Sequence, residues 1–488
     1  MTAADTGGRS DQTDRSDPSA SPPCDPLALA HLRPDWSAVQ PLTRAQRAVL
    51  LTLAAAAIAA AIFAPMVAAR TAVALCTLFY LAVTLYKLLL IRASERSGAI
   101  FDFDAAALAA RDARPWPLYS IIVPLYREPE TLPHLVHALA ALDYPEEAKD
   151  IQLLLEADDA ATVAAARALD LPPNIRLTLV PPSLPRTKPK ACNYGLHFAR
   201  GEYLVIYDAE DRPEPDQLKK AVLAFEASPP RVACVQSRLN YYNPRQNLLT
   251  RWFAAEYAAW FDMQLPGLAA LHAVIPLGGT SNHFVTAVLR DLLGWDAYNV
   301  AEDCDLGVRL CRAGYTTRMV ATTTWEEACS RLPIWIRQRT RWQKGYIQTY
   351  WVHMRRPLRL LRELGPAGFL HFQLLVGGVV FSSLVNPIFW LMALLWFGAR
   401  PEALSALFPG AIFAAATLCL FAGNFVFVYV NLLGCYKRRY DGLVWANLLT
   451  PCYWLLMSYS GWRAFLQFFR DPFQWEKTQH GFSAAEDG

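Results

Sequence analysis

YLVIYDAED, residues 203–211, joins five residues typical of a buried strand to three acids within four positions. The three acids are Asp208, Glu210 and Asp211. Carboxylates crowded at the end of an apolar strand repel one another and lose hydration, so a protein core has little reason to place them there. The stretch therefore predicts a strand that ends at a site for a divalent cation or a hydroxyl-rich ligand.

The surrounding segment repeats this strand pattern. Apolar runs of strand length lie at 118–125, 151–155, 176–180 and 203–207, and segments of helical periodicity lie at 131–142, 160–169, 189–199 and 215–227. Such alternation predicts an α/β fold with a mainly parallel sheet, whose ligands bind at the carboxyl ends of the strands. Acids also follow the first two strands, namely Glu128 and then Glu156, Asp158 and Asp159.

Long apolar stretches flank this segment. Residues 49–69 contain no charge and residues 71–91 contain only Lys87. At about 1.5 Å per residue, each can cross a hydrocarbon core of roughly 30 Å as a helix. Three more stretches follow, at 372–398, 405–433 and 443–462. Transmembrane spans thus account for a chain of 488 residues that is 54% hydrophobic and only 18% charged.

The positions of the arginines orient the spans. Arginines precede the first span and follow the second, whereas only Arg70 lies between them, so the segment from about 100 to 365 is expected in the cytosol. Positive charge at both ends of the last stretch favours an even number of C-terminal crossings. Either that stretch is re-entrant at Pro451, or another is divided near Pro387. Residues 1–42 are expected to be a disordered tail rather than a signal peptide.

Basic residues are expected at the acidic sheet edge as well. The stretch RTKPKACNYG places Arg186, Lys188 and Lys190 just before a helix. With the acids they suit a diphosphate chelated by Mg²⁺ or Mn²⁺, although a solvated basic loop explains them equally well on their own. P-loop and dinucleotide-binding motifs are absent from the sequence, and the scattered cysteines without a C-x-x-C pair predict free thiols rather than a zinc site.

Two downstream motifs complete the candidate chemistry. AEDCDLGVRLCRAG (301–314) predicts a helix with acids in its first turn. Asp303 is the better candidate for chemistry, whereas Asp305 is at least as well explained by the helix dipole. RQRTRWQKGYIQTYW (337–351) predicts a cationic aromatic helix that carries Gln338, Arg341 and Trp342. The alternative for that helix is an amphipathic segment lying on anionic lipid.

Taken in order, IIVPLYREPE, the acids after the second strand, KACN, DAED, AED and QRTRW, between membrane spans, resemble the motifs of processive inverting glycosyltransferases of family 2. This family includes cellulose, hyaluronan and chitin synthases, and the likeness is greatest to bacterial exopolysaccharide synthases and phage-adsorption-protein-B-like proteins. It implies a cytosolic GT-A nucleotide-diphospho-sugar transferase domain between helical spans. The implied divisions are 1–42 tail, 43–95 two spans, 100–330 GT-A domain, 331–368 amphipathic interface helices, 369–470 transmembrane region and 471–488 gating-loop-like tail.

The resemblance implies a role for each donor-site residue. Tyr126 and Glu128, with Glu156 or Asp158, would hold the uridine end of a UDP-sugar, and Lys190 would approach it from the KACN helix. Asp208 matches the first acid of the D-x-D element. Glu210 stands where the family has a second, metal-ligating Asp, and its longer side chain leaves Asp211 as a competing ligand for Mg²⁺ or Mn²⁺.

The resemblance also implies the acceptor site. Asp303 matches the general base of the T-E-D motif, here Ala-Glu-Asp, with Glu302 beside it as a substrate-binding residue. Residues 278–284 (GGTSNHF) occupy the place of a loop that lines the acceptor site. Gln338, Arg341 and Trp342 match the Q-x-x-R-W motif. Arg341 would neutralise the leaving diphosphate, and Trp342 would support the acceptor sugar.

The C-terminal stretch DPFQWEKTQHG (471–481) is similar to the gating loops of these synthases. Trp475 and Thr478 would then cover the bound nucleotide, whereas in a plain polar tail they have no special role. The five tryptophans of the C-terminal spans suit a glycan channel, and equally an aromatic belt at the membrane interface.

The expected function is polymerisation of a sugar from a UDP-sugar, with glucose ahead of N-acetylglucosamine, into a β-linked exopolysaccharide that crosses the bacterial inner membrane. One alternative is transfer of a single sugar to a lipid carrier, and the other is a catalytically inactive membrane receptor of the same fold. The expected partners are the UDP-sugar, the growing glycan, the bilayer and accessory secretion subunits, and no nucleic acid is expected.

Overall fold

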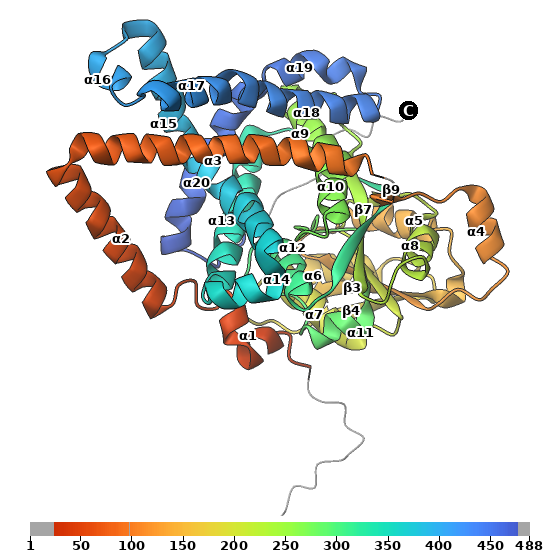
Figure 1. Ribbon diagram of the computed structural model, residues 1–488. Coiled ribbons are helices and arrows are strands. Elements are labelled where there is room, and N and C mark those ends of the chain that lie inside the picture. Colours follow the sequence, from red (N-terminus) through yellow and green to blue (C-terminus); the bar gives the residue numbers. More distant parts are fainter. Residues whose placement is uncertain (1–23, 97, 477–488) are drawn as a thin grey trace, which may run out of the picture.

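The computed structural model describes residues 24–96 and 98–476, and places a mixed β-sheet beside a bundle of long helices (Figure 1). The strands are β1 (Ile100–Phe101), β2 (Tyr119–Leu125), β3 (Lys149–Glu156), β4 (Ile175–Val180), β5 (Tyr203–Ile206), β6 (Arg212–Pro213), β7 (Val232–Tyr241), β8 (Asn282–Val285) and β9 (Thr316–Glu326). Their order is β1-β9-β7-β8-β5-β2-β3-β4, with β6 paired to β9. Only β8 and β6 run antiparallel to their neighbours in the described part, so the predicted mainly parallel sheet is confirmed.

Helices cover both faces of the sheet because successive strand residues point to opposite sides. Ile121 and Leu153 face a core formed with α5 (Leu132–Ala140), α6 (Ala160–Arg167) and α8 (Gln217–Glu226). Ile122 and Leu154 face the other core, formed with α7 (Lys188–Phe198), α9 (Leu248–Ala259), α10 (Leu265–Ala270) and α12 (Glu302–Arg312). The four strands and four helices predicted between 118 and 227 are all present within a few residues of their expected bounds.

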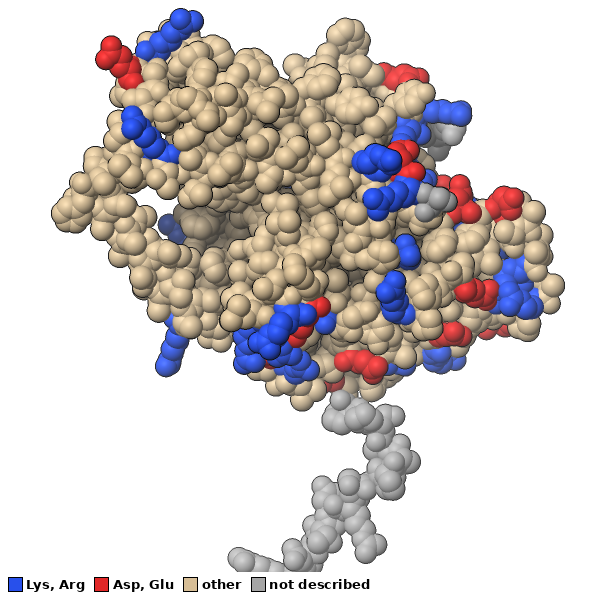
Figure 2. All heavy atoms as spheres, in the orientation of Figure 1, with Lys and Arg blue, Asp and Glu red and all other residues tan. Residues whose placement is uncertain are grey.

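Four helical segments of the described chain are long and apolar enough to span a membrane. They are α2 (Arg44–Phe63), α3 (Pro65–Ser94), Pro357–Ala399 and Gly410–Lys437. Figure 2 shows a broad surface almost without charge over these helices, whereas charged side chains gather over the sheet domain. The protein is therefore a multi-pass membrane protein.

Two C-terminal candidates fit the expected even number of crossings. The segment Pro357–Ala399 comprises α14 (Pro357–Phe372), η4 (Gln373–Gly377) and α15 (Gly378–Ala399), and it continues through Pro387. The segment Gly410–Lys437 comprises α17 (Gly410–Leu418), η5 (Cys419–Gly423) and α18 (Asn424–Lys437). The last apolar stretch becomes α20 (Thr450–Arg470), which is not among the candidate spans and packs against α13 and α15.

The remaining elements connect these layers. They are α1 (Ala28–Leu32), η1 (Pro34–Trp36), α4 (Ala105–Arg111), η2 (Glu146–Ala148), η3 (Trp260–Gln264), α11 (Thr286–Asp291), α13 (Leu332–His353), α16 (Glu402–Ser405), η6 (Asp441–Leu443) and α19 (Val444–Leu448).

Two expectations differ from the structure. Residues 24–42 form α1, η1 and a segment that packs on the sheet domain, so the disordered tail predicted for 1–42 does not extend to residue 42. Helix α13 is an internal helix rather than a helix lying on lipid. Trp335, Arg339 and Lys344 on this helix are all buried, because α12, α15 and α20 pack around it.

Candidate active site

A cavity of about 430 Å³ lies at the carboxyl ends of β2, β3 and β9 and beside the loop after β5. Its lining brings together most of the residues singled out in the sequence, although they are spread over some 350 positions of the chain. These are Tyr126, Glu128, Glu156, Asp208, Glu210, Glu302, Asp303, Gln338, Arg341, Trp342 and Trp475. The rule that acids at several strand ends meet at one edge therefore holds.

The acids after β5 divide into two groups. Asp208 and Glu210 line the cavity, whereas Asp211 is buried and lies outside the lining. One Asp211 oxygen accepts hydrogen bonds from the backbone N–H of Asp208, at 2.8 Å, and from the Thr280 hydroxyl. Asp211 thus helps to hold the loop in place, whereas Asp208 and Glu210 are the acids of this loop that line the cavity.

Lys188 balances part of this negative charge. Its ammonium forms an ion pair with Asp208 and donates a hydrogen bond to the carbonyl oxygen of Gly279 at 2.9 Å. Although burial favours the neutral amine, Asp208 and Glu302 raise the pKa of Lys188 above its usual value. The Asp208 carboxylate therefore already holds one positive group, as expected of a site that accepts cations.

The surroundings of Glu210 and Glu326 disfavour the charged form of both carboxylates. Burial, followed by the charges of Asp208 and Glu128, raises the pKa of Glu210 well above its usual range. Glu326, at the end of β9, has its pKa raised by burial and then by the three acids of the DAED loop. Sequence reasoning missed Glu326 and its neighbour Glu327, yet both line the cavity and follow a strand, so the strand-end rule would have found them.

No cluster of three or more His, Cys, Asp or Glu side chains in residues 24–96 and 98–476 forms a ready-made metal site. Mg²⁺ and Mn²⁺ need only one or two carboxylates when a substrate diphosphate supplies further oxygens. The donor set of Asp208 and Glu210 fits that requirement.

Two residues predicted to bind the sugar nucleotide lie outside the cavity lining and contact residues that form it. Lys190 is buried and forms a 2.8 Å ion pair with Glu156, so it orients that carboxylate but does not itself line the cavity. Asp158 also lies outside the lining and forms an ion pair with Arg186. Arg186 in turn donates to the Tyr126 hydroxyl at 3.1 Å and lines the cavity.

Asp303 lies in the first turn of α12 and points toward the glycine loop before β8. Its Oδ1 accepts the backbone N–H of Cys304 at 2.7 Å. Gly279 has φ of +82°, and a Cβ there would lie 3.0 Å from Asp303 Oδ2, so glycine keeps the carboxylate accessible. Burial raises the pKa of Asp303, and burial with the charge of Asp303 raises the pKa of Glu302 to about 7.

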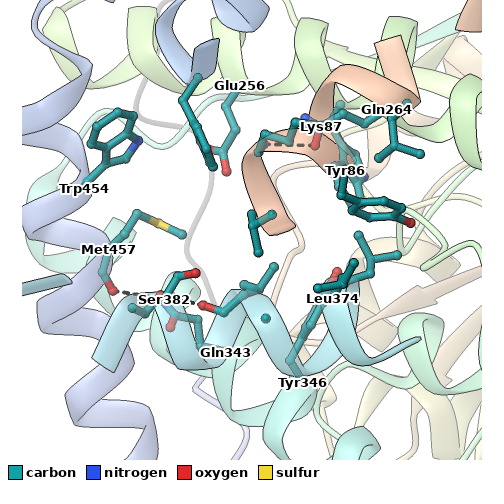
Figure 3. A pocket seen from close by; sticks show the side chains of 18 of the residues that line it. Tyr86, Lys87, Glu256, Gln264, Gln343, Tyr346, Leu374, Ser382, Trp454 and Met457 are labelled. Carbon is teal, nitrogen blue, oxygen red and sulfur yellow. Dashed lines mark hydrogen bonds between the residues drawn. The ribbon is translucent and has the colours of Figure 1, made fainter. Parts of the chain in front are cut away.

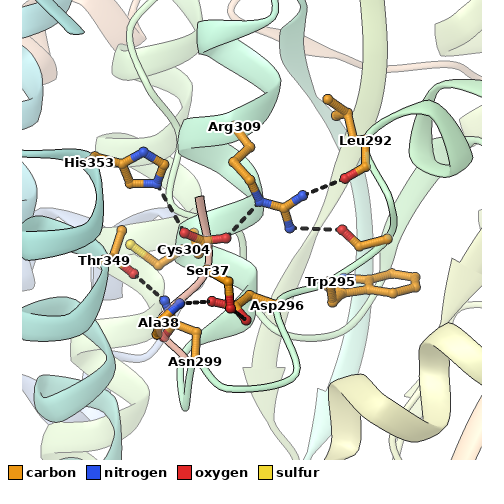
Figure 4. A network of polar contacts seen from close by, with 12 residues as sticks. Ser37, Ala38, Leu292, Trp295, Asp296, Asn299, Cys304, Arg309, Thr349 and His353 are labelled. Atoms are coloured by element: carbon orange, nitrogen blue, oxygen red, sulfur yellow. Dashed lines mark hydrogen bonds and ion pairs between the residues drawn. The ribbon is translucent and has the colours of Figure 1, made fainter. Parts of the chain in front are cut away.

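A buried polar network fixes the loop and helix that carry Asp303 (Figure 4). Asp305 accepts from Arg309 Nε at 2.7 Å and lies 3.0 Å from His353 Nε2 of α13. Asp296, on the loop before α12, accepts from the Ser37 hydroxyl at 2.8 Å and from the Ala38 N–H at 2.5 Å. Asp305 is therefore structural, and residues near the N-terminus hold the loop in place.

The Q-x-x-R-W residues face the same cavity from α13. Arg341 donates to the Val300 carbonyl at 3.3 Å, and its guanidinium lies 4.4 Å from the centre of the Trp475 ring. Gly345, one turn further along, allows close contact, since a Cβ there would lie 2.4 Å from the backbone nitrogen of Ala301. Helix α13 thus packs directly on the loop that precedes Asp303.

The C-terminal segment is anchored over this helix. Lys344 donates to the carbonyl oxygens of Asp471 and Gln474, at 3.1 and 2.9 Å. Trp475 consequently reaches the cavity, as the comparison with a gating loop requires. Thr478 lies outside the described residues.

A second cavity, of about 360 Å³, lies in the helical bundle (Figure 3). It is lined by residues of α3, α9, α15, α18 and α20. Both cavities are lined by Tyr257, Gly278, Ala301, Asp303 and Trp342. Asp303 and Trp342 therefore stand where the sheet-edge cavity meets the cavity of the bundle.

The family model described as "Glycosyltransferase like family 2" matches residues 116–345, the segment that carries nearly all of this site. Residues 116–345 are therefore similar to family 2 glycosyltransferases. The probable glycosyltransferase YdaM of Bacillus subtilis (strain 168) is 26% identical over 232 residues, covering 47% of this chain and 55% of that protein. Glucomannan 4-beta-mannosyltransferase 2 of Arabidopsis thaliana is 27% identical over 212 residues, covering 41% and 39%.

A solved structure supports the fold of the transferase domain. Mannosyltransferase PcManGT from Pyrobaculum calidifontis, in complex with GDP-Man and Mn²⁺, superposes with a TM-score of 0.50 at 20% identity. The match covers 82% of this chain and 99% of that one. The predicted α/β GT-A fold is thereby confirmed. The matched sequence spans about half or less of the length of the two curated relatives.

Proposed function

We propose that the protein is a processive, inverting hexosyltransferase that extends a β-linked glycan from a nucleoside diphosphate sugar and conducts the product through its helical bundle. The observation that carries this proposal is that the two cavities share lining residues, Asp303 and Trp342 among them. The proposal includes a catalytic domain in the cytosol of a bacterium and spans in its inner membrane, as the arginine pattern predicts.

In the proposed reaction, Asp303 accepts the proton of an acceptor hydroxyl as that oxygen attacks the anomeric carbon from the face opposite the diphosphate. Inversion at that carbon results. A base whose pKa is raised by burial holds a transferred proton better than an ordinary aspartate. Arg341, which lines the first cavity, stabilises negative charge on the departing diphosphate.

Asp208 and Glu210 would hold a Mg²⁺ or Mn²⁺ ion together with the diphosphate, and such an ion would supply further charge stabilisation. Lys188 contributes its own positive charge at Asp208. Tyr126, Glu128 and Glu156 would contact the nucleoside, with Lys190 and Arg186 orienting these side chains. Trp475 would close the site over the nucleotide by stacking on Arg341.

Glucose from UDP-glucose is the donor predicted from the sequence. The names of the Arabidopsis relative and of the solved archaeal protein refer to mannosyl transfer, so GDP-mannose is the competing donor. Transfer of one sugar to a lipid carrier is the second candidate, because the bundle cavity also suits a lipid-linked acceptor.

The test uses purified full-length protein in proteoliposomes with radiolabelled UDP-glucose, UDP-N-acetylglucosamine or GDP-mannose, each with Mg²⁺, Mn²⁺ or a chelator. We expect a polymer of high molecular mass from one donor, cleaved by a linkage-specific β-glycanase. A labelled glycolipid would favour the second candidate. Absence of product from every donor, with no release of nucleoside diphosphate, would support an inactive receptor and reject the proposal.

A further inference from the structure

Lys87 is the one charged residue of an otherwise apolar stretch, and it lines the cavity of the helical bundle. It lies seven residues before the end of α3, which places its Cα about 10 Å inside the helix terminus. A lysine at this depth can extend its side chain toward the interface. Instead, its ammonium donates to Gln264 Oε1 at 3.1 Å (Figure 3). It also lies 4.3 Å from the centre of the Phe427 ring.

Neither contact neutralises the charge of Lys87. Within the described chain, Lys87 forms no ion pair, and its partners are an amide oxygen and a ring face. The nearby acid is Glu256, which also lines the cavity. Its carboxylate is already bound by both Arg339 Nη atoms, one of them at 2.9 Å, and by the Tyr453 hydroxyl at 2.7 Å. Glu256 and Arg339 therefore balance each other and leave Lys87 as a surplus cation.

An unpaired charge inside a membrane protein costs free energy, so such a charge usually has an oppositely charged partner or a function. The two acids among the described residues of the cavity wall, Glu256 and Asp303, form no ion pair with Lys87, whereas the cavity gives a ligand access to its ammonium. We propose that Lys87 is a binding site for a negatively charged oxygen group, a carboxylate or a phosphate, on the molecule that enters the bundle cavity. This inference rests on the proposed function in one respect, which is that the molecule in the bundle cavity is the acceptor of the transferred sugar.

Two acceptors carry such a group. A glycan containing a uronic acid would place a carboxylate beside Lys87, and a polyprenyl phosphate would place its phosphate there. The neutral sugar rings of the glycan, or the apolar chain of the polyprenyl phosphate, would contact the aromatic wall, which includes Trp454 and Phe427. Lys87 would then select the acceptor, whereas Asp303 accepts the proton of the attacking hydroxyl where the acceptor is a glycan.

The experiment measures binding, so it does not depend on turnover. Full-length protein in nanodiscs is titrated with two matched pairs of probes. The first pair is a β-linked oligosaccharide with one glucuronate and its methyl ester, and the second is a polyprenyl phosphate and the corresponding polyprenol. The variants are Lys87→Met, Lys87→Arg and Lys437→Met, the last removing a lysine near the same membrane edge that pairs with Glu95 outside the cavity. Binding of uridine diphosphate to each variant reports that the separate nucleotide cavity is folded.

We expect the wild type to bind the charged member of at least one pair roughly tenfold or more tightly than its neutral partner, as for a hydrogen bond to a charged group. Lys87→Met should abolish that preference, and Lys87→Arg and Lys437→Met should keep it. The pair that shows the preference identifies the source of the anion. Equal binding of both members of both pairs by the wild type, or a preference retained by Lys87→Met, would overturn the inference. Loss of all nucleotide release in the proteoliposome assay would reject the proposed function without affecting this result.

Discussion

The two cavities share part of their lining but are built in opposite ways. The cavity at the sheet edge is lined by carboxylates and cations, and several of its acids have pKa values raised by burial. The cavity in the helical bundle is mainly apolar and aromatic, with Lys87, Glu256, Arg339 and Asp303 as its charged residues. A site that binds a compact anion needs fixed charges, whereas a passage for sugar rings needs aromatic surface. Residues at the boundary should therefore act on transfer to the acceptor, whereas residues deeper in either cavity should act on nucleotide binding or on the passage of the product alone.

The largest effect is expected at Asp303, which lines both cavities. The Asp303→Asn substitution removes the proposed base but keeps its shape, so transfer should fall by roughly three orders of magnitude. Binding of the nucleoside diphosphate should stay within about twofold, because its contacts lie in the first cavity alone. Isothermal titration and initial-rate assays measure the two quantities.

The exposed acid Asp291, at the end of α11, supplies the matched control, and Asp291→Asn should leave both quantities unchanged. Near-normal turnover by Asp303→Asn would show that another group accepts the proton. Equal losses of turnover and nucleotide binding in Asp303→Asn would show that Asp303 is also needed for nucleotide binding.

This contrast explains what the sequence could predict. The sheet-edge cavity depends on short-range patterns, since an acid that follows an apolar strand must lie at the carboxyl edge, and Asp208 and Glu210 were found in this way. Lys190 and Asp211 were predicted to lie in the site, but both are buried outside the cavity lining. Their positions depend on contacts between separate elements, such as the ion pair of Lys190 on α7 with Glu156 on β3, which a sequence pattern does not specify. Glu326 was missed although it obeys the same strand-end rule.

The bundle cavity was not predictable in this manner. Its wall combines residues of α3, α15, α18 and α20, and a hydropathy pattern does not specify which face of each helix meets which neighbour. Even the turn between the first two spans lies at Ala64, not near Arg70 as predicted. The packing of residues 24–42 on the Asp296 loop likewise depends on contacts across about 260 residues.

Asp296 tests whether that distant packing supports the boundary between the cavities. In Asp296→Asn an amide must replace one oxygen that accepts from Ser37 or from the Ala38 N–H. Because these donors are buried, the free energy of unfolding should fall by about 1–3 kcal/mol. Thermal unfolding in detergent measures this change. Asp216→Asn, on a more exposed carboxylate of α8's N-cap, should have no comparable effect. An unchanged unfolding temperature for Asp296→Asn would show that residues 37–38 do not stabilise the loop.

The pH dependence of kcat/KM should distinguish a buried base at Asp303 from an ordinary surface carboxylate. Asp303 must be deprotonated to accept a proton, so kcat/KM should fall as pH falls through its pKa, by about tenfold per pH unit on the acid limb. Burial raises that pKa, which places the limb above the value of about 3.9 for an exposed aspartate. Lys188 lowers the pKa of Asp303, so Lys188→Met should move the limb to higher pH. An acid limb near pH 4 in both proteins would contradict the assignment.

Trp342 should give the smallest effect and the sharpest division between the cavities. Its ring packs against Tyr257, with centroids 6.4 Å apart, and lies 4.6 Å from the Arg339 guanidinium. If the exposed part of the ring supports the acceptor, Trp342→Ala should remove about 0.5–1.5 kcal/mol of contact with the sugar and raise the acceptor KM roughly threefold to tenfold. Product chains should also become shorter, because each elongated chain dissociates sooner, whereas the donor KM should stay unchanged. Trp445→Ala, at a tryptophan that is 80% exposed on the bundle surface, is the control and should alter none of these values. A rise in donor KM with unchanged chain length would place Trp342 in the nucleotide cavity instead, and the two cavities would then share a catalytic base but no acceptor platform.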